Sequence, residues 1–230
     1  LMCRNCLIHG RFVVGVCPHM QLTQDIARHE LPKSIRLALI GGEALRLDRW
    51  QAWQQTVGEK IVLFNTYGPT ETTVVATALD LTHCPAPRPP IGQAFQYVQL
   101  YVLDEYLQPV PRGVLGELFI GGIQVARGYL HRPELTAEKF INLPQLGQRV
   151  YRTGDLVRYR EDGHLEFWGR SDNQIKIRGF RIEPGEIENV LSQHPAVQTA
   201  IVTDKVDEFG DKRLIAYIIL TSEIAISELK

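Results

Sequence analysis

Residues 61–73 read IVLFNTYGPTETT, and this stretch indicates the fold of the chain. The apolar run 61–64 predicts a buried strand, and Gly68-Pro69 forces a bend soon after it. Three hydroxyl side chains and the Glu71 carboxylate then follow within a few residues. Because open α/β sheets bind ligands beyond the carboxyl ends of their strands, this polar segment is a candidate site for phosphate and Mg²⁺. The alternative is a polar turn that binds nothing.

The segments on either side of this stretch alternate between helical and strand patterns. Five elements are predicted before residue 80: a helix that begins near Leu22 and ends at Pro32, a strand at 35–40, a helix at 44–57, and strands at 61–64 and 73–79. The order of strand, helix and strand indicates an α/β layer with parallel pairing.

The middle of the chain has a different pattern. Four prolines within residues 84–90 indicate a linker or a rigid crossing. A short helix is predicted at 133–140, and Asp162-Gly163 is a strong hairpin signal. The predicted strands of this mostly β part are 98–103, 115–120, 156–159 and 165–168.

The last part of the chain alternates again and predicts a small α+β unit. Pro184, followed by acidic residues, is typical of a helix start. The predicted elements are a strand at 174–177, a helix at 186–191, and strands at 197–202 and 214–220.

The composition excludes several classes of protein. The chain has 230 residues, 44% of them hydrophobic, and a formal charge of −1. A strongly basic nucleic-acid binder and a disordered chain are therefore not expected. No apolar run approaches the roughly 18 residues that a membrane-spanning helix needs, so we expect no membrane partner. Four cysteines at this length do not indicate a disulfide scaffold, and the expected compartment is the reducing cytoplasm.

Two further motifs carry candidate chemistry. In YRTGD (151–155), a carboxylate follows a Thr-Gly bend and could accept two hydrogen bonds from a ribose diol. In GRSDNQIKIRGFRIEPGEIE (169–188), four cations lie within twelve residues of a β segment. The alternative for this second motif is a solvated strand face.

Together these segments resemble the adenylate-forming (AMP-binding) superfamily, and most closely the amino-acid adenylation domains of non-ribosomal peptide synthetases. The resemblance extends over about residues 21–230, with NTYGPTE and DNQIKIRGFRIEPGEIE favouring the amino-acid branch over acyl-CoA ligases and luciferases. The matching stretches are IRLALIGGEAL (35–45), FNTYGPTET (64–72), GELFIGGIQVARGYLHRPELTAEKF (116–140), YRTGDL (151–156) and GRSDNQIKIRGFRIEPGEIE (169–188).

The resemblance implies an α/β fold class and the C-terminal portion of the adenylate-forming fold. Residues 21–90 would belong to a layered α/β unit, 91–170 to a distorted β-barrel unit, and 171–230 to the start of an α+β lid. Residues 1–20 do not resemble the family and form a separate leader.

The resemblance also implies an activity, in which ATP and Mg²⁺ activate an amino acid as aminoacyl-AMP with release of pyrophosphate. The phosphopantetheine thiol of a carrier domain would then take the aminoacyl group. Carrier and condensation domains of a synthetase are the implied partners, and alignment and charge stabilisation would dominate catalysis.

Individual residues take implied roles from this resemblance. Glu71 would hold Mg²⁺, Thr70 would touch phosphate and Tyr67 would lie against adenine. Asp155 would bind ribose, and Arg170 would contact the nucleotide and join Thr70 and Glu71 in catalysis. The full implied nucleotide-binding set is Gly41, Gly42, Glu43, Asn65, Thr66, Tyr67, Gly68, Thr70, Asp155 and Arg170.

The same resemblance implies roles for the lid and the substrate pocket. Asp172 would be the hinge of the lid, and Gly179 would line the pantetheine path. A hydrophobic, leucine-like amino acid would fit the implied pocket walls, which are Leu39, Gly41, Thr66, Val74 and Val75. The alternative is that strand residues such as Val74 and Val75 only form core.

Three departures from the family pattern leave other interpretations open. The family's phosphate loop and substrate-anchoring aspartate do not precede residue 21, and its C-terminal lysine does not occur by Lys230. Residues 1–20 are the third departure. They form either a non-native or divergent leader or a segment that binds zinc. The alternatives are a non-catalytic remnant that binds nucleotide weakly or a neighbouring domain, and a small zinc-containing interaction protein. The possible zinc ligands are Cys3, Cys6, Cys17 and His19.

We predict that the 230-residue chain alone catalyses little or no adenylation. Loss of a cation that stabilises the transferring phosphoryl group typically lowers rates by orders of magnitude. ATP–pyrophosphate exchange is the measurement, and robust exchange by the isolated chain would contradict the prediction.

Overall fold

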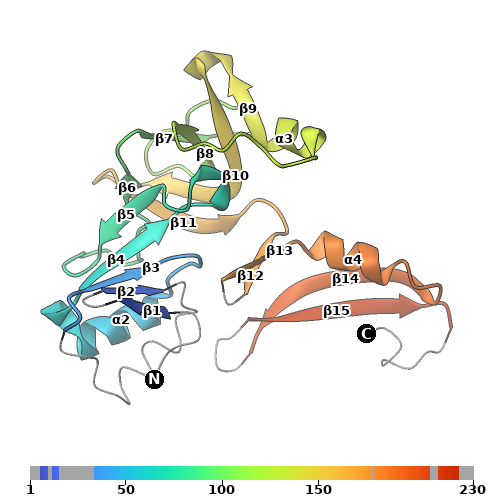
Figure 1. Ribbon diagram of the computed structural model, residues 1–230, viewed down its shortest axis with the longest axis horizontal. Coiled ribbons are helices and arrows are strands. Elements are labelled where there is room, and N and C mark those ends of the chain that lie inside the picture. Colours follow the sequence, from blue (N-terminus) through green and yellow to red (C-terminus); the bar gives the residue numbers. More distant parts are fainter. Residues whose placement is uncertain (1–5, 10–11, 16–33, 178, 208–211, 223–230) are drawn as a thin grey trace. The chain divides into compact units, whose positions relative to one another are not determined.

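The computed structural model describes residues 6–9, 12–15, 34–177, 179–207 and 212–222, and it divides the chain into two compact units. The first unit is Leu1–Ser171 and the second is Asp172–Lys230 (Figure 1). The helix predicted before Pro32 and the candidate zinc set lie outside the residues whose side chains are described. Within the described residues, no helix combines the length and apolar character needed to span a membrane.

A six-stranded sheet begins the first unit, with its strands side by side in chain order. β2–β3 and β3–β4 are parallel, which confirms the predicted α/β layer, and the other pairs are antiparallel. The strands are β1 (Cys6–His9), β2 (Phe12–Gly15), β3 (Leu37–Ile40), β4 (Val62–Tyr67), β5 (Thr77–Asp80) and β6 (Gln93–Ala94).

Helix α2 (Leu47–Thr56) connects β3 to β4 and covers one face of this sheet (Figure 1). Its Trp50 and Trp53 are buried in a cluster with Leu63 of β4 and with Ile35, which lies just before β3. Burial of a large apolar side chain stabilises a fold by about 1.5–3 kcal/mol, so these two rings account for much of the attachment of α2. The helix is followed by a 3₁₀ turn, η1 (Gly58–Lys60).

The segment after β4 differs from the prediction of a strand at 73–79. β4 continues to Tyr67, and a 3₁₀ turn, η2 (Thr70–Thr72), follows it. Thr73 and Val74 then have φ angles of 58° and 71°, a left-handed backbone that cannot continue a strand. The predicted strand is therefore wrong in its first half, and β5 begins at Thr77.

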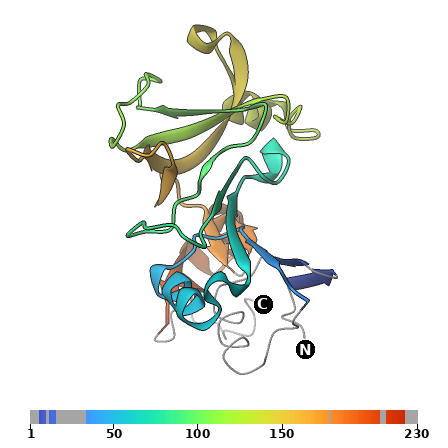
Figure 2. The ribbon, with the colours of Figure 1, turned by 90° about the vertical axis from the view of Figure 1, so that its left-hand side faces the viewer.

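A second, antiparallel sheet follows in the order β11-β10-β8-β7, with β9 paired to β10 (Figure 2). It confirms the predicted strands, although β10 begins at Gln148, well before the predicted start at 156. α3 (Pro133–Lys139) confirms the predicted short helix, and η3 (Pro144–Leu146) precedes β10. The strands are β7 (Val98–Leu103), β8 (Gly116–Gly122), β9 (Phe140–Leu143), β10 (Gln148–Tyr159) and β11 (Leu165–Arg170).

Hydrogen bonds after the prolines join the second sheet to the first. The side-chain amide of Asn65 in β4 donates to Pro90 O at 2.7 Å. Ile91 N then donates to Leu165 O, and Leu165 N to Gly92 O, each at 2.8 Å. The predicted linker is thus a fixed crossing between the two sheets.

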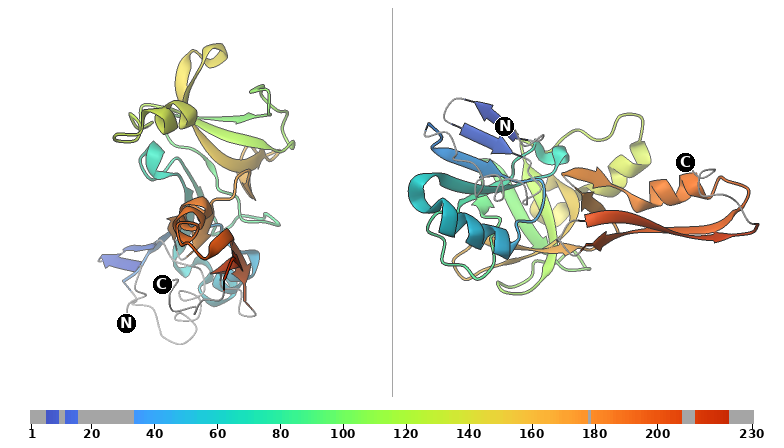
Figure 3. Two further views of the ribbon diagram at one scale, coloured as in Figure 1. Left: turned by 90° about the vertical axis from the view of Figure 1, so that its right-hand side faces the viewer. Right: turned by 90° about the horizontal axis from the view of Figure 1, so that it is seen from below.

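The second unit contains a short hairpin, a helix and a long two-stranded ribbon (Figure 3). The helix begins at Pro184, as the sequence indicates, and lies along the ribbon. The Glu188 carboxylate accepts a hydrogen bond from Val202 N at 2.7 Å, which ties helix to ribbon. The elements are β12 (Ile175–Ile177), β13 (Phe180–Ile182), α4 (Pro184–Leu191), β14 (Val197–Val206) and β15 (Lys212–Leu220).

We predict that Gly92→Ala destabilises the chain far more than Gly113→Ala. Both glycines have positive φ, but a Cβ at Gly92 would overlap Ala78 O, whereas a Cβ at Gly113 would meet nothing within 4 Å. The left-handed backbone costs about 1–2 kcal/mol at either site, and overpacking adds about 1–3 kcal/mol at Gly92. Urea unfolding measures both losses, and equal losses would contradict the prediction.

Candidate functional site

Asp155 lies at the centre of the candidate nucleotide site. Its side chain is buried, yet Oδ1 accepts a hydrogen bond from Arg170 Nη1 at 2.7 Å, and Oδ2 accepts one from the Tyr67 hydroxyl at 2.5 Å. Three residues singled out separately in the sequence thus meet from β4, β10 and β11. The arrangement places a carboxylate, a guanidinium and an aromatic ring within one small region.

The TGD motif explains how Asp155 is aimed. The pairing of β10 with β8 shifts register here, and Gly154 at the shift has φ +74°. The Thr153 hydroxyl donates to Leu118 O at 2.7 Å and accepts from Asp155 N at 2.9 Å. Gly154 N donates to the Glu117 carboxylate at 3.1 Å. The motif therefore forms a hydrogen-bonded irregularity that directs Asp155 towards Tyr67 and Arg170.

Tyr67 is fixed as a hydrogen-bond donor. Burial raises the pKa of its hydroxyl well above the usual value, and the neighbouring Asp155 carboxylate raises that pKa further. The hydroxyl consequently stays protonated throughout the physiological pH range. The Tyr67 ring also packs against the core of the second sheet.

Glu71 lies in η2 and is also buried, with 6% of its surface exposed. Its Oε1 accepts a hydrogen bond from the Tyr129 hydroxyl at 2.5 Å, and its carbonyl oxygen accepts one from Ala126 N at 2.8 Å. Burial, followed by the hydrogen bond to Glu71, raises the pKa of Tyr129, which keeps this hydroxyl a donor. The sequence motif contains Tyr129, but its spacing from Glu71 does not indicate this contact.

The surroundings of Glu71 fit a Mg²⁺ site in which this carboxylate supplies one ligand and nucleotide phosphates supply others. The described residues include no group of three or more His, Cys, Asp or Glu side chains that could hold a metal alone. Mg²⁺ usually binds one or two carboxylates, several waters and phosphate oxygens. Glu71, held by the Tyr129 hydroxyl, fits this pattern because carboxylates that bind metals are themselves hydrogen-bonded.

The ends of β3 and β4 approach each other closely beside these groups. The Thr66 hydroxyl donates to Ile40 O at 2.8 Å. A Cβ on Gly41 would lie 2.5 Å from that hydroxyl oxygen, so this position requires glycine. Gly42 next to it has φ +84°, and Glu43 is half-buried.

Gly68 makes a similar close approach to the residues after η2. A Cβ there would lie 2.6 Å from Val74 O and 2.9 Å from the Val75 Cα. Val74 is 69% exposed and Val75 is half-buried. The interpretation of Val74 as a core strand residue is therefore wrong, because its left-handed backbone presents the side chain to solvent.

The remaining predicted site residues are separate from these contacts. The Asn65 amide serves the fold through Pro90, and Thr70 is exposed at the start of η2. Leu39 is half-buried in β3. Asp172 begins the second unit, where its carboxylate accepts a hydrogen bond from Gln174 N at 3.1 Å, and Gly179 of the same unit has φ +79°.

A family model described as AMP-binding enzyme matches residues 11–130. The chain belongs to this family of adenylate-forming ligases. The match begins within residues 1–20, the segment in which the sequence motifs show no resemblance.

Two bacterial peptide synthases are similar to most of the chain. Tyrocidine synthase 2 of Brevibacillus parabrevis is 46% identical over 90% of this chain, which covers 6% of that protein. The dimodular nonribosomal peptide synthase of Bacillus subtilis (strain 168) is 50% identical over 84% of this chain, which covers 8% of that protein. The chain thus spans only a small part of these curated relatives.

A solved structure confirms the fold class. An artificially fused adenylation–PCP didomain of a non-ribosomal peptide synthetase, NpsA-ThdA from Klebsiella oxytoca, superposes with a TM-score of 0.76. It is 28% identical, and the match covers 95% of this chain and 40% of that one. The architecture is therefore the C-terminal portion of the adenylate-forming fold.

We predict that Arg170→Gln strongly destabilises the chain, whereas Arg152→Gln does not. Arg170 and Asp155 are 12% and 4% exposed, and breaking a buried pair typically costs about 3–5 kcal/mol. Arg152, which pairs with Glu117, is 47% exposed, and exposed pairs are worth at most about 1 kcal/mol.

Urea unfolding of both variants measures the difference. Asp155→Asn added to Arg170→Gln should recover part of the loss, because it removes the charge left without its guanidinium. Equal losses for the two single variants would contradict the prediction.

Proposed function

We propose that the chain is part of an amino-acid adenylation domain of a non-ribosomal peptide synthetase. The domain would use ATP and Mg²⁺ to activate an amino acid as aminoacyl-AMP, releasing pyrophosphate. The aminoacyl group would then pass to the phosphopantetheine thiol of a carrier domain. The contact of Asp155 with both Tyr67 and Arg170 is the observation that carries this proposal.

The geometry around Asp155 supports nucleoside binding. Each carboxylate oxygen can accept more than one hydrogen bond, so contacts with Tyr67 and Arg170 do not by themselves prevent Asp155 from accepting bonds from a ribose diol. The Tyr67 ring, held by its hydroxyl, would offer a surface to adenine. Arg170 would stay charged beside the ribose and phosphates.

Glu71 and Thr70 would serve the phosphates. When bound, Mg²⁺ would offset the negative charge that the phosphates carry. Glu71 would hold the ion at an orientation fixed by Tyr129, and the exposed Thr70 hydroxyl would donate to a phosphate oxygen. These residues would align the α-phosphate for attack by the substrate carboxylate, with pyrophosphate leaving.

The proposed substrate is a hydrophobic, leucine-like amino acid. The close contact of Gly41 with Thr66 leaves no side chain between these strand ends. Val74 and Val75 supply aliphatic surface beside Gly68, and Leu39 would complete this part of the wall. An apolar pocket discriminates among side chains mainly by size.

Carrier and condensation domains are the proposed partners. The relatives include a dimodular nonribosomal peptide synthase, and the solved neighbour joins an adenylation domain to a PCP domain. In this proposal the second unit moves about Asp172, and Gly179 lines the path of the phosphopantetheine arm. A glycine there leaves room for a close approach to the arm.

A chimera tests the proposal. The chain replaces the segment that it matches in the Bacillus subtilis relative, and amino-acid-dependent ATP–pyrophosphate exchange is measured with the unmodified relative as reference. We predict exchange with leucine-like amino acids. Asp155→Asn in the chimera should raise the KM for ATP by about 10–100-fold, because charge-assisted hydrogen bonds are worth about 1.5–3 kcal/mol.

Asp162→Asn is the matched control. Asp162 lies in the β10–β11 hairpin turn, where a hydrogen bond from Arg160 lowers its pKa to about 2. This substitution should leave the KM for ATP unchanged. A folded chimera without amino-acid-dependent exchange would contradict the proposal, as would equal effects of the two substitutions.

A further inference from the structure

Tyr129 connects Glu71 to a segment that is distant in sequence. It lies in the loop between β8 and α3, and its hydroxyl donates to Glu71 Oε1 at 2.5 Å. Its ring packs edge-on against Phe140, with ring centroids 5.4 Å apart. The phenol is therefore held at its ring as well as at its hydroxyl.

The same loop contacts the backbone around Glu71. Ala126 N donates to Glu71 O at 2.8 Å, and the Thr73 hydroxyl donates to Gln124 O at 2.9 Å. With the Tyr129 hydroxyl, the loop thus holds the Glu71 side chain, the Glu71 backbone and the residue that follows η2. Displacement of the loop would consequently displace the carboxylate.

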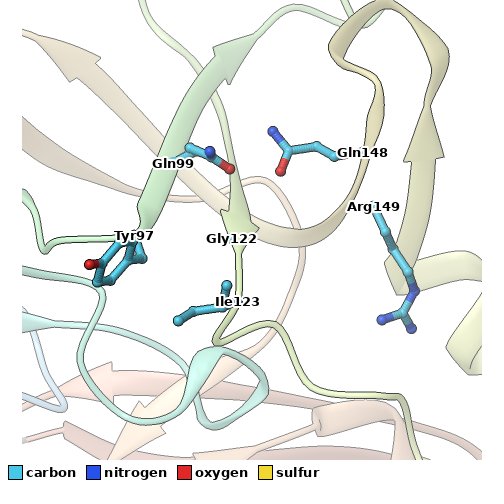
Figure 4. A pocket seen from close by; sticks show the side chains of 6 residues that line it. All are labelled: Tyr97, Gln99, Gly122, Ile123, Gln148 and Arg149. Carbon is cyan, nitrogen blue, oxygen red and sulfur yellow. The ribbon is translucent and has the colours of Figure 1, made fainter.

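Arg149 anchors this loop to the second sheet. Its Nη1 donates to Ala126 O at 2.7 Å, and its Nη2 donates to Arg127 O at 2.8 Å. The guanidinium also lies over the Phe140 ring, 4.6 Å from its centroid. Arg149 of β10 and Gly122 of β8 line an open pocket of about 440 Å³ (Figure 4). Ile123 also lines this pocket.

α3 fixes the backbone of Tyr129 itself. Tyr129 N donates to the Thr136 hydroxyl oxygen at 2.9 Å. Gly128 has φ +142°, and a Cβ there would overlap the Thr136 side chain. This close packing leaves the phenol little freedom to move.

We propose that Tyr129 is a positioning residue that sets the orientation of the Glu71 carboxylate towards Mg²⁺ and the nucleotide phosphates. The inference rests on the proposed function, since it takes Glu71 as the metal ligand. Mutation of a residue that hydrogen-bonds a metal ligand typically lowers metal affinity by about 10–100-fold. Tyr129 suits the role because its hydroxyl fixes the carboxylate without adding positive charge.

Mn²⁺ binding in the presence of ATP tests the inference directly. The 230-residue chain is titrated with Mn²⁺, and the free ion is measured by electron paramagnetic resonance. Tyr129→Phe should weaken Mn²⁺ binding by roughly 10-fold. Tyr106→Phe is the matched control at a tyrosine that is 75% exposed, and it should bind Mn²⁺ like the unaltered chain.

ATP binding in EDTA separates positioning from a structural role. Tyr129→Phe should bind ATP without metal as well as the unaltered chain does, because only the orientation of Glu71 changes. Glu71→Gln should lower Mn²⁺ affinity at least as much as Tyr129→Phe does. In the double variant, Tyr129→Phe should cause no loss beyond that of Glu71→Gln. Equal loss of ATP affinity with and without metal would overturn the inference.

The two proposals fail in distinguishable ways. If the unaltered chain shows no metal-dependent ATP binding, the inference is overturned, whereas the proposed function is judged by amino-acid-dependent exchange in the chimera. If Glu71→Gln abolishes Mn²⁺ binding while Tyr129→Phe matches Tyr106→Phe, only the inference is overturned. If Tyr129→Phe does not fold, Thr136→Val is used in its place, because this substitution removes the hydroxyl that accepts a hydrogen bond from Tyr129 N. We then expect a several-fold loss of Mn²⁺ affinity. An unchanged affinity would overturn the inference.

Discussion

A buried carboxylate must be paired, and Asp155 meets that requirement only where three strands converge. Arg170 supplies the opposite charge and Tyr67 a neutral donor. β4 therefore has to continue as far as Tyr67, β10 has to change register before Asp155, and β11 has to reach Arg170. One electrostatic requirement thereby constrains all three strands and brings the candidate nucleotide site together.

Glu71 is buried in the same way but is held differently. The Glu71 carboxylate accepts a hydrogen bond from the neutral phenol of Tyr129, which lies in the β8–α3 loop. Asp155 accepts a charge-assisted hydrogen bond from the Arg170 guanidinium, a type of bond that is stronger than one between neutral groups. The two carboxylates thus accept hydrogen bonds from different kinds of donor, a phenol for Glu71 and a guanidinium for Asp155.

Local pattern predicted much of the fold, because α2, α4 and most strands of the second sheet have regular apolar spacing. It failed at 73–76, since β-branched residues such as Val74 favour strands wherever tertiary structure does not intervene. The motifs indicated Tyr67, Glu71, Asp155 and Arg170 as site residues, but not which of them touch. Tyr129 was missed because its contact depends on how a long loop folds back onto η2, and no local period encodes that contact.

The failure at 73–76 is itself informative about the site. Left-handed backbone at a residue other than glycine costs about 1–2 kcal/mol, and Thr73 and Val74 adopt it consecutively. Nearby contacts offset this cost, namely the bond of Thr73 to Gln124 O and the bond of Ala76 N to Tyr67 O at 2.8 Å. Val74 in this segment is exposed, and Thr73 bonds the same β8–α3 loop that contacts Glu71. Strain here is therefore coupled to the position of the candidate ligand groups, as expected where local propensity and function conflict.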